Sequence, residues 1–298
     1  MNDDRLYLPA EWAVQSGVQL TWPHAGTDWA PYLDEITETY LQLADAITRH
    51  EALLVVSPEV EHVRELLEAR LGRARMDRVV FACCDTDDTW ARDHGAITLM
   101  GGDEPVLLDF RFNGWGEKFG WQHDNAITRH LCEQGLLHGR REDHDDMVLE
   151  GGSIESDGRG TVFTTSQCLL APHDTLLYIK CSDQADEHYA DFCAMERELQ
   201  ALRTDDGRPY RLIALPMVDE IRYDDERLPA TYANFLIVNG AVIYPTYDQP
   251  HNDQVAAEAL HQAFPDHELI GIDSRVIIRQ HGSVHCLTMQ LPEGVLRR

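Results

Sequence analysis

One cysteine of the sequence stands where a nucleophile would be placed. Cys286 closes the segment Gly282-Ser283-Val284-His285-Cys286, near the end of the chain. The glycine allows the backbone to approach a ligand closely, and the histidine can bias the thiol toward the thiolate. A buried core thiol fits the same pattern, because cysteine is among the residue types most often buried. The functional interpretation therefore depends on two acidic segments upstream.

The first acidic segment, residues 87–95, follows an apolar stretch at residues 79–82 that is typical of a strand. It brings three aspartates, Trp90 and Arg92 to the end of that strand, which favours the wall of a polar pocket. The alternative is a surface turn in which Arg92 pairs with a neighbouring aspartate. A surface turn would leave Trp90 exposed without a reason. The segment is therefore predicted to line a pocket.

The second acidic segment is Glu150-Gly151-Gly152-Ser153-Ile154, which follows the apolar residues 147–149. A glutamate at the end of an apolar strand, followed by two glycines, points a carboxylate to a place where backbone comes close. A hairpin turn with an exposed acid is the alternative for this segment taken alone. Two acidic segments and a late cysteine together indicate a planar, cationic substrate that is attacked by sulfur.

Both segments and the cysteine belong to a longer ordered series of motifs. The series comprises Thr21-Trp22-Pro23-His24, Trp90-Ala91-Arg92-Asp93-His94-Gly95, Asn113-Gly114-Trp115-Gly116, Glu150-Gly151-Gly152, residues 234–247 and Gly282 to Cys286. As a set they resemble the agmatine deiminases, within the guanidine-modifying (pentein) superfamily that also holds the arginine deiminases. The resemblance runs nearly from end to end of the chain, and it is specific only as a set.

The resemblance implies roles for four residues. Cys286 is expected to be the nucleophile, and Asp93 and Glu150 are expected to line the guanidinium pocket. Trp90 is expected to be part of the substrate-binding site. No metal and no organic cofactor is required by this chemistry.

The chain departs from the family at one place. In the family, a segment with an Asp-x-His-x-Asp element supplies the general acid/base histidine and a second guanidinium-binding aspartate. This sequence passes from Ala171-Pro172-His173 directly to Asp174, so a few dozen residues are expected to be missing at about 173–174. His173 and His188 do not stand at matching positions, and neither receives a role.

Length and composition fit an intracellular enzyme. The 298 residues can bury a large core, and length alone leaves one or two domains open. No linker is visible, and the resemblance implies one deiminase domain over residues 1–298. No apolar run approaches the roughly 20 residues of a membrane span, and the N-terminus lacks a signal-peptide pattern. The seven scattered cysteines lack the spacing of a zinc site, so reduced thiols and a cytoplasmic location are expected.

The formal net charge of −27 bears on the partners. It argues against nucleic acid, because such proteins must neutralise phosphates. It suits a cationic substrate, whose local concentration an acidic surface raises; solubility or adaptation to salt would explain the charge equally. The cluster at residues 138–146 mixes histidines, acids and two arginines. We expect a solvated loop there rather than a metal site.

Hydrophobic periodicity predicts alternating strands and helices, and hence an α/β fold. Helices are expected at residues 32–50, 60–71, 125–134, 187–202 and 255–264, the last capped by Asn252 or Asp253. Strands are expected at residues 18–22, 53–56, 79–84, 96–100, 106–109, 147–149, 161–164, 176–180, 211–215, 235–238 and 241–247. The resemblance implies a five-bladed α/β propeller with the site on its axis. The pattern alone also fits a doubly wound sheet.

The leading hypothesis is a hydrolase that converts agmatine to N-carbamoylputrescine and ammonia through an S-amidino-cysteine. Agmatine has no α-carboxylate, so its pocket needs no arginine, and Arg92 is expected to pair with an acid instead. One alternative is deimination of arginine or peptidyl-arginine. A second alternative is a non-catalytic agmatine or polyamine binder, which the missing segment favours. The expected partner is a small cationic guanidine, without nucleic acid or membrane, and a homo-oligomer is possible.

Overall fold

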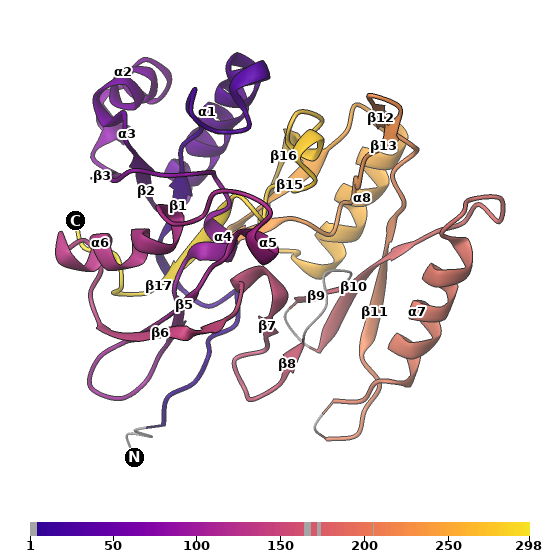
Figure 1. Cartoon of the computed structure of the whole chain (residues 1–298). Coiled ribbons are helices and arrows are strands. Elements are labelled where there is room, and N and C mark those ends of the chain that lie inside the picture. Colours follow the sequence, from indigo (N-terminus) through magenta and orange to yellow (C-terminus); the bar gives the residue numbers. More distant parts are fainter. Residues whose placement is uncertain (1–4, 164–167, 172–173, 205) are drawn as a thin grey trace. The chain divides into compact units, whose positions relative to one another are not determined.

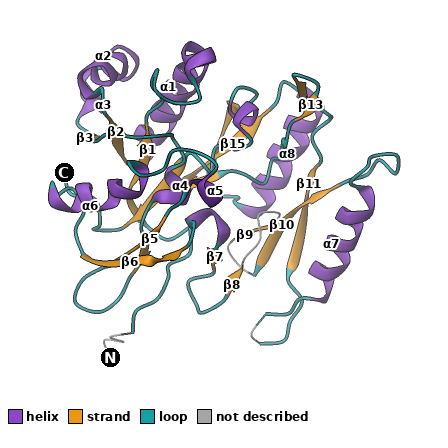
Figure 2. Ribbon diagram, in the orientation of Figure 1, coloured by secondary structure: helices purple, strands orange, loops and turns teal. Residues whose placement is uncertain are grey.

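The computed structural model describes residues 5–163, 168–171, 174–204 and 206–298. The chain divides into two compact units, one formed by residues 1–164 with 285–298 and the other by residues 165–284. Both units contain strands and helices, so the predicted α/β class is confirmed (Figures 1 and 2). His173, at the junction where the sequence predicts that a segment is missing from this chain, lies outside the described residues.

The main sheet of the first unit has the strand order β17-β1-β2-β3. Its strands are β1 (Gln15–Thr21), β2 (Ala52–Ser57), β3 (Val79–Cys83) and β17 (Thr288–Pro292). β1 is antiparallel to β17 and parallel to β2, which is parallel to β3. All six residues of β2 are buried, which identifies it as a central strand.

Helices α1 (Leu33–His50) and α2 (Val60–Leu71) pack against β2 (Figure 1). α2 has the predicted bounds. Apolar spacing in the sequence predicts one inward face on α1, made of Leu33, Ile36, Tyr40, Leu43 and Ile47. The last four are fully buried and Leu33 is partly buried. Short helices α3 (Arg73–Met76) and α4 (Ala91–His94) flank β3 on its two sides along the chain.

A second sheet of the first unit has the order β4-β5-β6, with α6 (Ile127–Glu133) between the last two strands. β4 (Ile97–Leu99) is antiparallel to β5 (Val106–Arg111), and β5 is parallel to β6 (Arg140–Val148). The prediction of a solvated loop at residues 138–146 was wrong, because most of these residues form β6. Backbone pairing with β5 and the ion pair from Arg141 Nε to Asp109 at 2.6 Å hold this polar edge strand.

No metal site is formed in that cluster or elsewhere in the described residues, where no group of three His, Cys, Asp or Glu side chains could hold an ion. No helix in the described part of the chain is long and apolar enough to cross a membrane. The first unit also contains a small hairpin of β7 (Glu155–Ser156) and β8 (Val162–Phe163), together with α5 (Gly114–Glu117).

The second unit contains two three-stranded sheets and a hairpin. One sheet consists of β9 (Cys168–Ala171), β10 (Thr175–Lys180) and β11 (Arg211–Pro216), with α7 (Tyr189–Ala201). The other consists of β14 (Leu236–Val238), β15 (Ala241–Thr246) and β16 (Glu268–Asp273), with α8 (Pro250–Ala263). The hairpin pairs β12 (Arg222–Tyr223) with β13 (Glu226–Arg227).

The expected cap of the last helix was wrong. α8 begins at Pro250 rather than 255, and its N-cap is Gln249. The Asp253 carboxylate accepts bonds from the backbone N–H groups of Tyr247 and Gln249, both at 3.1 Å, and from the Tyr232 hydroxyl at 2.7 Å. It therefore anchors the loop that enters the helix instead of capping it.

Four of these sheets share one arrangement: an antiparallel pair, a helix, and a third strand parallel to the second. The arrangement recurs in β17-β1-β2, β4-β5-β6, β9-β10-β11 and β14-β15-β16. The β7–β8 hairpin differs, since it forms a two-stranded sheet within the described residues. β9 begins only a few residues later and pairs with β10 instead.

Candidate active site

The loop that leads from β3 into α4 is held by a second loop, at residues 123–124. The buried Asp124 carboxylate accepts the backbone N–H groups of Asp87 at 2.8 Å and Asp88 at 2.9 Å. Asp87 in turn accepts the backbone N–H and the ring Nδ1 of His123, both at 2.8 Å. Burial raises the pKa of Asp124 to about 8, with the neighbouring aspartates adding to it. These reciprocal bonds fix the acidic segment rather than leave it in solvent.

Trp90 is held inside this segment. Its Nε1–H donates to Asp88 at 3.0 Å, and Trp29 Nε1–H donates to the other oxygen of Asp88 at 3.1 Å. The Trp90 ring is 5 % exposed and lies 6.3 Å from the ring of Trp115, centroid to centroid. An exposed surface turn is therefore excluded, and Trp90 contributes a buried aromatic wall.

Asp93 receives hydrogen bonds but no counter-charge. Trp115 Nε1–H donates to its Oδ2, and the Gly152 backbone N–H donates to its Oδ1, both at 3.2 Å. Among the described residues Asp93 forms no ion pair. Burial raises its pKa to about 6; the Trp115 bond opposes this rise and the nearby charge of Glu150 adds to it. Two carboxylates thus lie close together with too little positive charge around them.

Trp115 reaches Asp93 from an unusual turn. All four residues of α5 have positive φ: Gly114 at 60°, Trp115 at 54°, Gly116 at 86° and Glu117 at 62°. Asn113 stabilises the turn, because its Oδ1 accepts the Gly116 N–H at 2.9 Å. A bulky residue in the left-handed region is strained, and such strain is concentrated at functional sites. Sequence reasoning noted the motif but assigned no role to Trp115; the two glycines on either side of it were the available signal.

The two glycines after Glu150 lie directly against α4. A Cβ on Gly151 would overlap the Arg92 carbonyl oxygen, and a Cβ on Gly152 would overlap Asp93 Oδ1. The predicted close approach of backbone at this motif is confirmed. It brings Glu150 and the Gly152 N–H to the Asp93 carboxylate.

Cys286 lies in the turn that immediately precedes β17, and it is partly buried. Its carbonyl oxygen accepts the Arg92 backbone N–H at 3.2 Å. Thr288 closes the turn, donating its N–H at 3.1 Å and its hydroxyl at 3.0 Å to the carbonyl of His285. The backbone of α4 therefore joins the cysteine turn to Asp93. The four residues predicted from the sequence all belong to the first unit, and they lie in this short helix or next to it.

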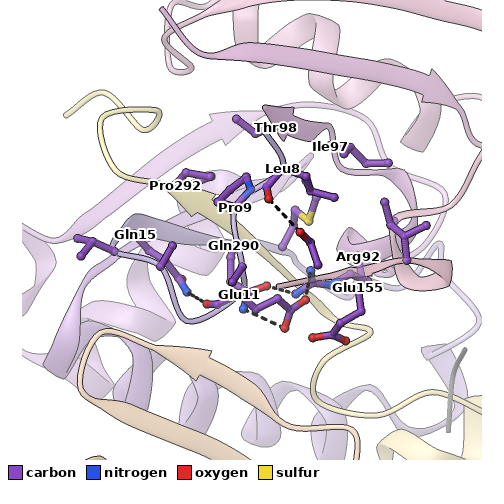
Figure 3. A pocket seen from close by; sticks show the side chains of 17 residues that line it. Leu8, Pro9, Glu11, Gln15, Arg92, Ile97, Thr98, Glu155, Gln290 and Pro292 are labelled. Atoms are coloured by element: carbon purple, nitrogen blue, oxygen red, sulfur yellow. Dashed lines mark hydrogen bonds and ion pairs between the residues drawn. The ribbon is translucent and has the colours of Figure 1, made fainter. Parts of the chain in front are cut away.

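Arg92 does not pair with a neighbouring aspartate. Its Nη1 donates to Glu11 at 2.9 Å, and its Nη2 donates to Gln290 (Figure 3). The expectation that Arg92 pairs with an acid is met by a residue far upstream that the sequence did not indicate. The cavity of about 80 Å³ drawn in Figure 3 includes Glu11, Arg92 and Gly151 in its wall, but none of the four predicted site residues. This cavity is therefore not the candidate active site, which is formed around Asp93 and Glu150.

Comparison with known proteins identifies the family. The Porphyromonas-type peptidyl-arginine deiminase family matches residues 7–175 and 171–292. The chain belongs to this family. The two matched segments together span nearly all of the chain, and they meet at residues 171–175.

Full-length relatives within this family carry names that are more specific. The agmatine deiminase of Pseudomonas putida is 30 % identical, over 99 % of this chain and 97 % of its own. A solved structure of the agmatine deiminase of C. jejuni with substrate bound has a TM-score of 0.86 at 29 % identity, covering 98 % of each chain. A proposed arginine deiminase of Porphyromonas gingivalis has a TM-score of 0.90 at 42 % identity, covering 98 % of this chain and 100 % of that one.

The alignments also show a difference in length. The alignment with the Pseudomonas putida protein extends over 366 positions, although this chain has only 298 residues. The relative therefore has residues with no counterpart here.

Proposed function

We propose that this protein deiminates agmatine, with ammonia and N-carbamoylputrescine as products. The observation that carries the proposal is the state of Asp93. Its carboxylate has a pKa raised to about 6, lies near the second negative charge of Glu150, and forms no ion pair among the described residues. The two carboxylates therefore have less positive charge around them than would balance their negative charge, and a bound cation would supply it. A guanidinium supplies that charge and can donate in its plane to both carboxylates.

Aromatic side chains support a flat cation. The rings of Trp90 and Trp115 lie 6.3 Å apart at an interplanar angle of 76°, and the Trp115 indole donates to Asp93. The faces of indole rings attract cations, most strongly where water is excluded. A compact ammonium would use the carboxylates alone, whereas a guanidinium uses both the carboxylates and the ring faces.

The choice of agmatine over arginine rests on the bonds that the Arg92 side chain already makes. An arginine substrate carries an α-carboxylate that needs a cation, and Arg92 is the arginine adjacent to Asp93. Both of its terminal nitrogens are already bonded, to Glu11 and to Gln290. The names of the full-length relatives from Pseudomonas putida and C. jejuni point the same way. The more similar Porphyromonas gingivalis protein makes arginine the second candidate.

The reaction is proposed to pass through a covalent adduct on Cys286. The thiolate forms a bond to the central guanidinium carbon, and the resulting tetrahedral adduct expels one nitrogen as ammonia. This leaves an S-amidino-cysteine. Water then adds to the same carbon, the carbon–sulfur bond breaks, and the ureido product leaves with the thiol restored. Dividing the hydrolysis in this way lowers the barrier of a resonance-stabilised group. Asp93 and Glu150 hold the positive charge during both steps.

The proton transfers are the step most affected by the difference in length. We propose that the segment missing at about residues 173–174 is the one that carries the family's acid/base histidine. Three observations support this: the two matched segments meet at residues 171–175, the β7–β8 hairpin lacks, within the described residues, the helix and parallel strand of the other sheets, and the relatives are longer. The thiolate adds to the guanidinium carbon without a base, and the leaving nitrogen can take its proton from solvent water, whereas adduct hydrolysis needs a group that activates water.

A burst experiment tests the proposal. The protein, verified by intact mass as these 298 residues, is mixed with excess agmatine, and ammonia is measured over time. The expected result is a burst of about one ammonia per protein followed by slow release. The Cys286-containing peptide should gain the mass of agmatine minus ammonia. Cys286→Ser should show neither signal, because a serine hydroxyl is a far poorer nucleophile.

Two other outcomes would change the conclusion. Agmatine binding with no ammonia burst and no adduct would make the protein a binder rather than an enzyme. A burst with free arginine or an arginine peptide, but not with agmatine, would exchange the substrate. Fast multiple turnover would mean that another group of this chain activates water, and the proposal for the missing segment would fail.

We further propose a five-bladed α/β propeller for the whole chain and a cytoplasmic location. The repeated arrangement of four sheets, with the β7–β8 hairpin as an incomplete fifth, supports the propeller. The seven cysteines are scattered along the sequence, as expected where thiols are kept reduced. The charge of −27 supports a protein that does not bind nucleic acid. An experimental structure and sedimentation of the purified protein would test the propeller and the predicted oligomer.

A further inference from the structure

Four polar side chains from distant segments meet beside the candidate active site. Glu11 precedes β1, Arg92 lies in α4, His285 lies in the cysteine turn, and Gln290 lies in β17 (Figure 3 shows three of them). The side chains of Glu11, Arg92 and His285 are only 13 %, 7 % and 10 % exposed. Glu11 is the centre of the cluster, because each of the other three side chains contacts its carboxylate.

The contacts of Glu11 use both of its oxygens. Arg92 Nη1 lies 2.9 Å from Oε1, and His285 Nε2 lies 2.8 Å from Oε1 and 3.0 Å from Oε2. The Gln290 amide donates to Oε2 at 3.4 Å, and its own oxygen accepts Arg92 Nη2. The carboxylate therefore lies between one permanent cation and one imidazole.

The protonation of the imidazole follows from its partner. Burial acts to raise the pKa of Glu11, but His285 and Arg92 outweigh it and bring that pKa to about 2. The group is thus a carboxylate at neutral pH and can only accept, so His285 Nε2 must carry a proton. Burial and the charge of Arg92 lower the pKa of His285, and Glu11 opposes this only in part. The imidazole is therefore neutral at neutral pH, with its lone pair on Nδ1.

The cluster is bonded to both reacting parts of the site. His285 immediately precedes Cys286, and Arg92 immediately precedes Asp93. The Arg92 backbone N–H also bonds the Cys286 carbonyl at 3.2 Å. The charged side chains of α4 and of the cluster are Arg92, Asp93 and Glu11. Of these, only Arg92 is positive, and Glu11 is the acid that contacts it.

We propose that Glu11 is a positioning residue for Cys286: it fixes His285 in the Nε2–H tautomer and cancels the charge of Arg92 beside the turn that carries the cysteine. The inference rests on the proposed function only in taking Cys286 as the nucleophile. If Glu11 only stabilised the fold, a variant that still folds would keep the His285 tautomer and the reactivity of the Cys286 thiol unchanged.

The test compares Glu11→Gln and Glu11→Asp with a matched control, Asp109→Asn. The control also removes a buried carboxylate from an arginine of the same unit, Arg141, but on β5. One readout is the tautomer of His285 by ¹⁵N-histidine NMR, assigned through loss of its signals in His285→Gln. The other is the rate at which iodoacetamide alkylates Cys286 at neutral pH, followed on the Cys286 peptide by mass spectrometry.

The wild-type protein should show the Nε2–H tautomer alone. In Glu11→Gln the amide can donate or accept, so the Nδ1–H tautomer should appear. The uncompensated Arg92 should lower the pKa of the thiol by about one unit and speed alkylation about tenfold. Glu11→Asp should restore the tautomer and bring the rate within about twofold of wild type, because the charge is retained. Asp109→Asn should change neither readout.

An unchanged tautomer in Glu11→Gln, or an alkylation rate equal to that of Asp109→Asn, would overturn the proposal. Neither readout uses agmatine. If the protein bound or converted no guanidine, the proposed function would fail while the role of Glu11 was still decided. If Glu11→Gln unfolded, Gln290→Leu gives a second variant. It removes the amide contact but keeps the charges of Glu11 and Arg92, and it should leave the tautomer unchanged.

Discussion

Two carboxylates have opposite surroundings: Glu11, which contacts α4 at Arg92, and Asp93, which lies in α4. Glu11 contacts the guanidinium of Arg92 and the imidazole of His285, and its pKa falls to about 2. Asp93, the next residue after Arg92, receives only the N–H groups of Trp115 and Gly152, and its pKa rises to about 6. The difference arises from charge and not from burial, since burial raises the pKa of both.

The difference separates a closed cluster from an open site. The Glu11 cluster is already neutral, so it gains nothing from a further cation and serves to hold the chain. The Asp93 site has surplus negative charge, an arrangement that is concentrated at functional sites. The single turn α4 thus carries both Arg92, the cation of the Glu11 cluster, and Asp93, the carboxylate without an ion-pair partner among the described residues. The variants below are expected to affect stability in one region and ligand affinity in the other.

The largest effect is expected on the stability of the fold. Glu11→Ala leaves the buried Arg92 guanidinium without a counter-charge, so the free energy of unfolding should fall by about 3–5 kcal/mol. Asp93→Asn removes a charge that burial already disfavours, and it should change the same quantity by no more than about 1 kcal/mol. Urea denaturation at neutral pH measures both. Equal losses in the two variants would contradict the distinction between a closed cluster and an open site.

The next largest effect is expected on agmatine affinity, and here Asp93 rather than Glu11 is the residue that matters. In the non-reacting Cys286→Ser background, Asp93→Asn should weaken agmatine binding by about 100-fold, because a charge-assisted bond in a desolvated site is lost. Asp109→Asn, which removes a carboxylate from β5, should leave the affinity within about twofold. Titration calorimetry measures both. Normal affinity in a folded Asp93→Asn variant would remove Asp93 from the guanidinium pocket.

The sequence predicted the local parts of this comparison well. The inward face of α1 follows from the spacing of Ile36, Tyr40, Leu43 and Ile47, and the Glu-Gly-Gly motif indicated close backbone approach. These features depend on neighbours within a few residues of one another. The glycine pair needs no knowledge of its partner, because the absence of side chains is itself the signal.

The distant parts could not be predicted in the same way. Glu11 and His285 are 274 residues apart, and Glu11 and Arg92 are 81 residues apart, so no local pattern indicates their contact. β17 received no prediction, because its partner β1 lies at the opposite end of the chain. Most of β6, up to residue 146, was taken for a loop, since its polar residues reflect an edge position that only the sheet defines. Trp115 was named within a motif, but its role follows from a left-handed turn that residue types alone do not reveal.

The smallest effect concerns the pH at which each carboxylate influences stability, and it distinguishes the two regions most directly. The pKa of Asp93 is raised to about 6, so the folded state binds a proton that the unfolded state releases between about pH 6 and pH 4. Its contribution should therefore become more favourable as pH falls through that window. Glu11 has a pKa lowered to about 2, so its contribution is complete above about pH 4 and is lost as pH falls toward 2. His94, with a pKa lowered to about 4 by burial, titrates in the first window, and the fold loses stability there as His94 is protonated.

The useful quantity is thus the difference in unfolding free energy between each variant and wild type. From pH 7 to pH 4 that difference should move by about 2 kcal/mol for Asp93→Asn. For Glu11→Gln it should stay constant when measured in the His285→Gln background, which is needed because Glu11 raises the pKa of His285. Urea denaturation at several pH values measures it, and a slope for Glu11→Gln in the upper window would mean that its carboxylate is not held by Arg92.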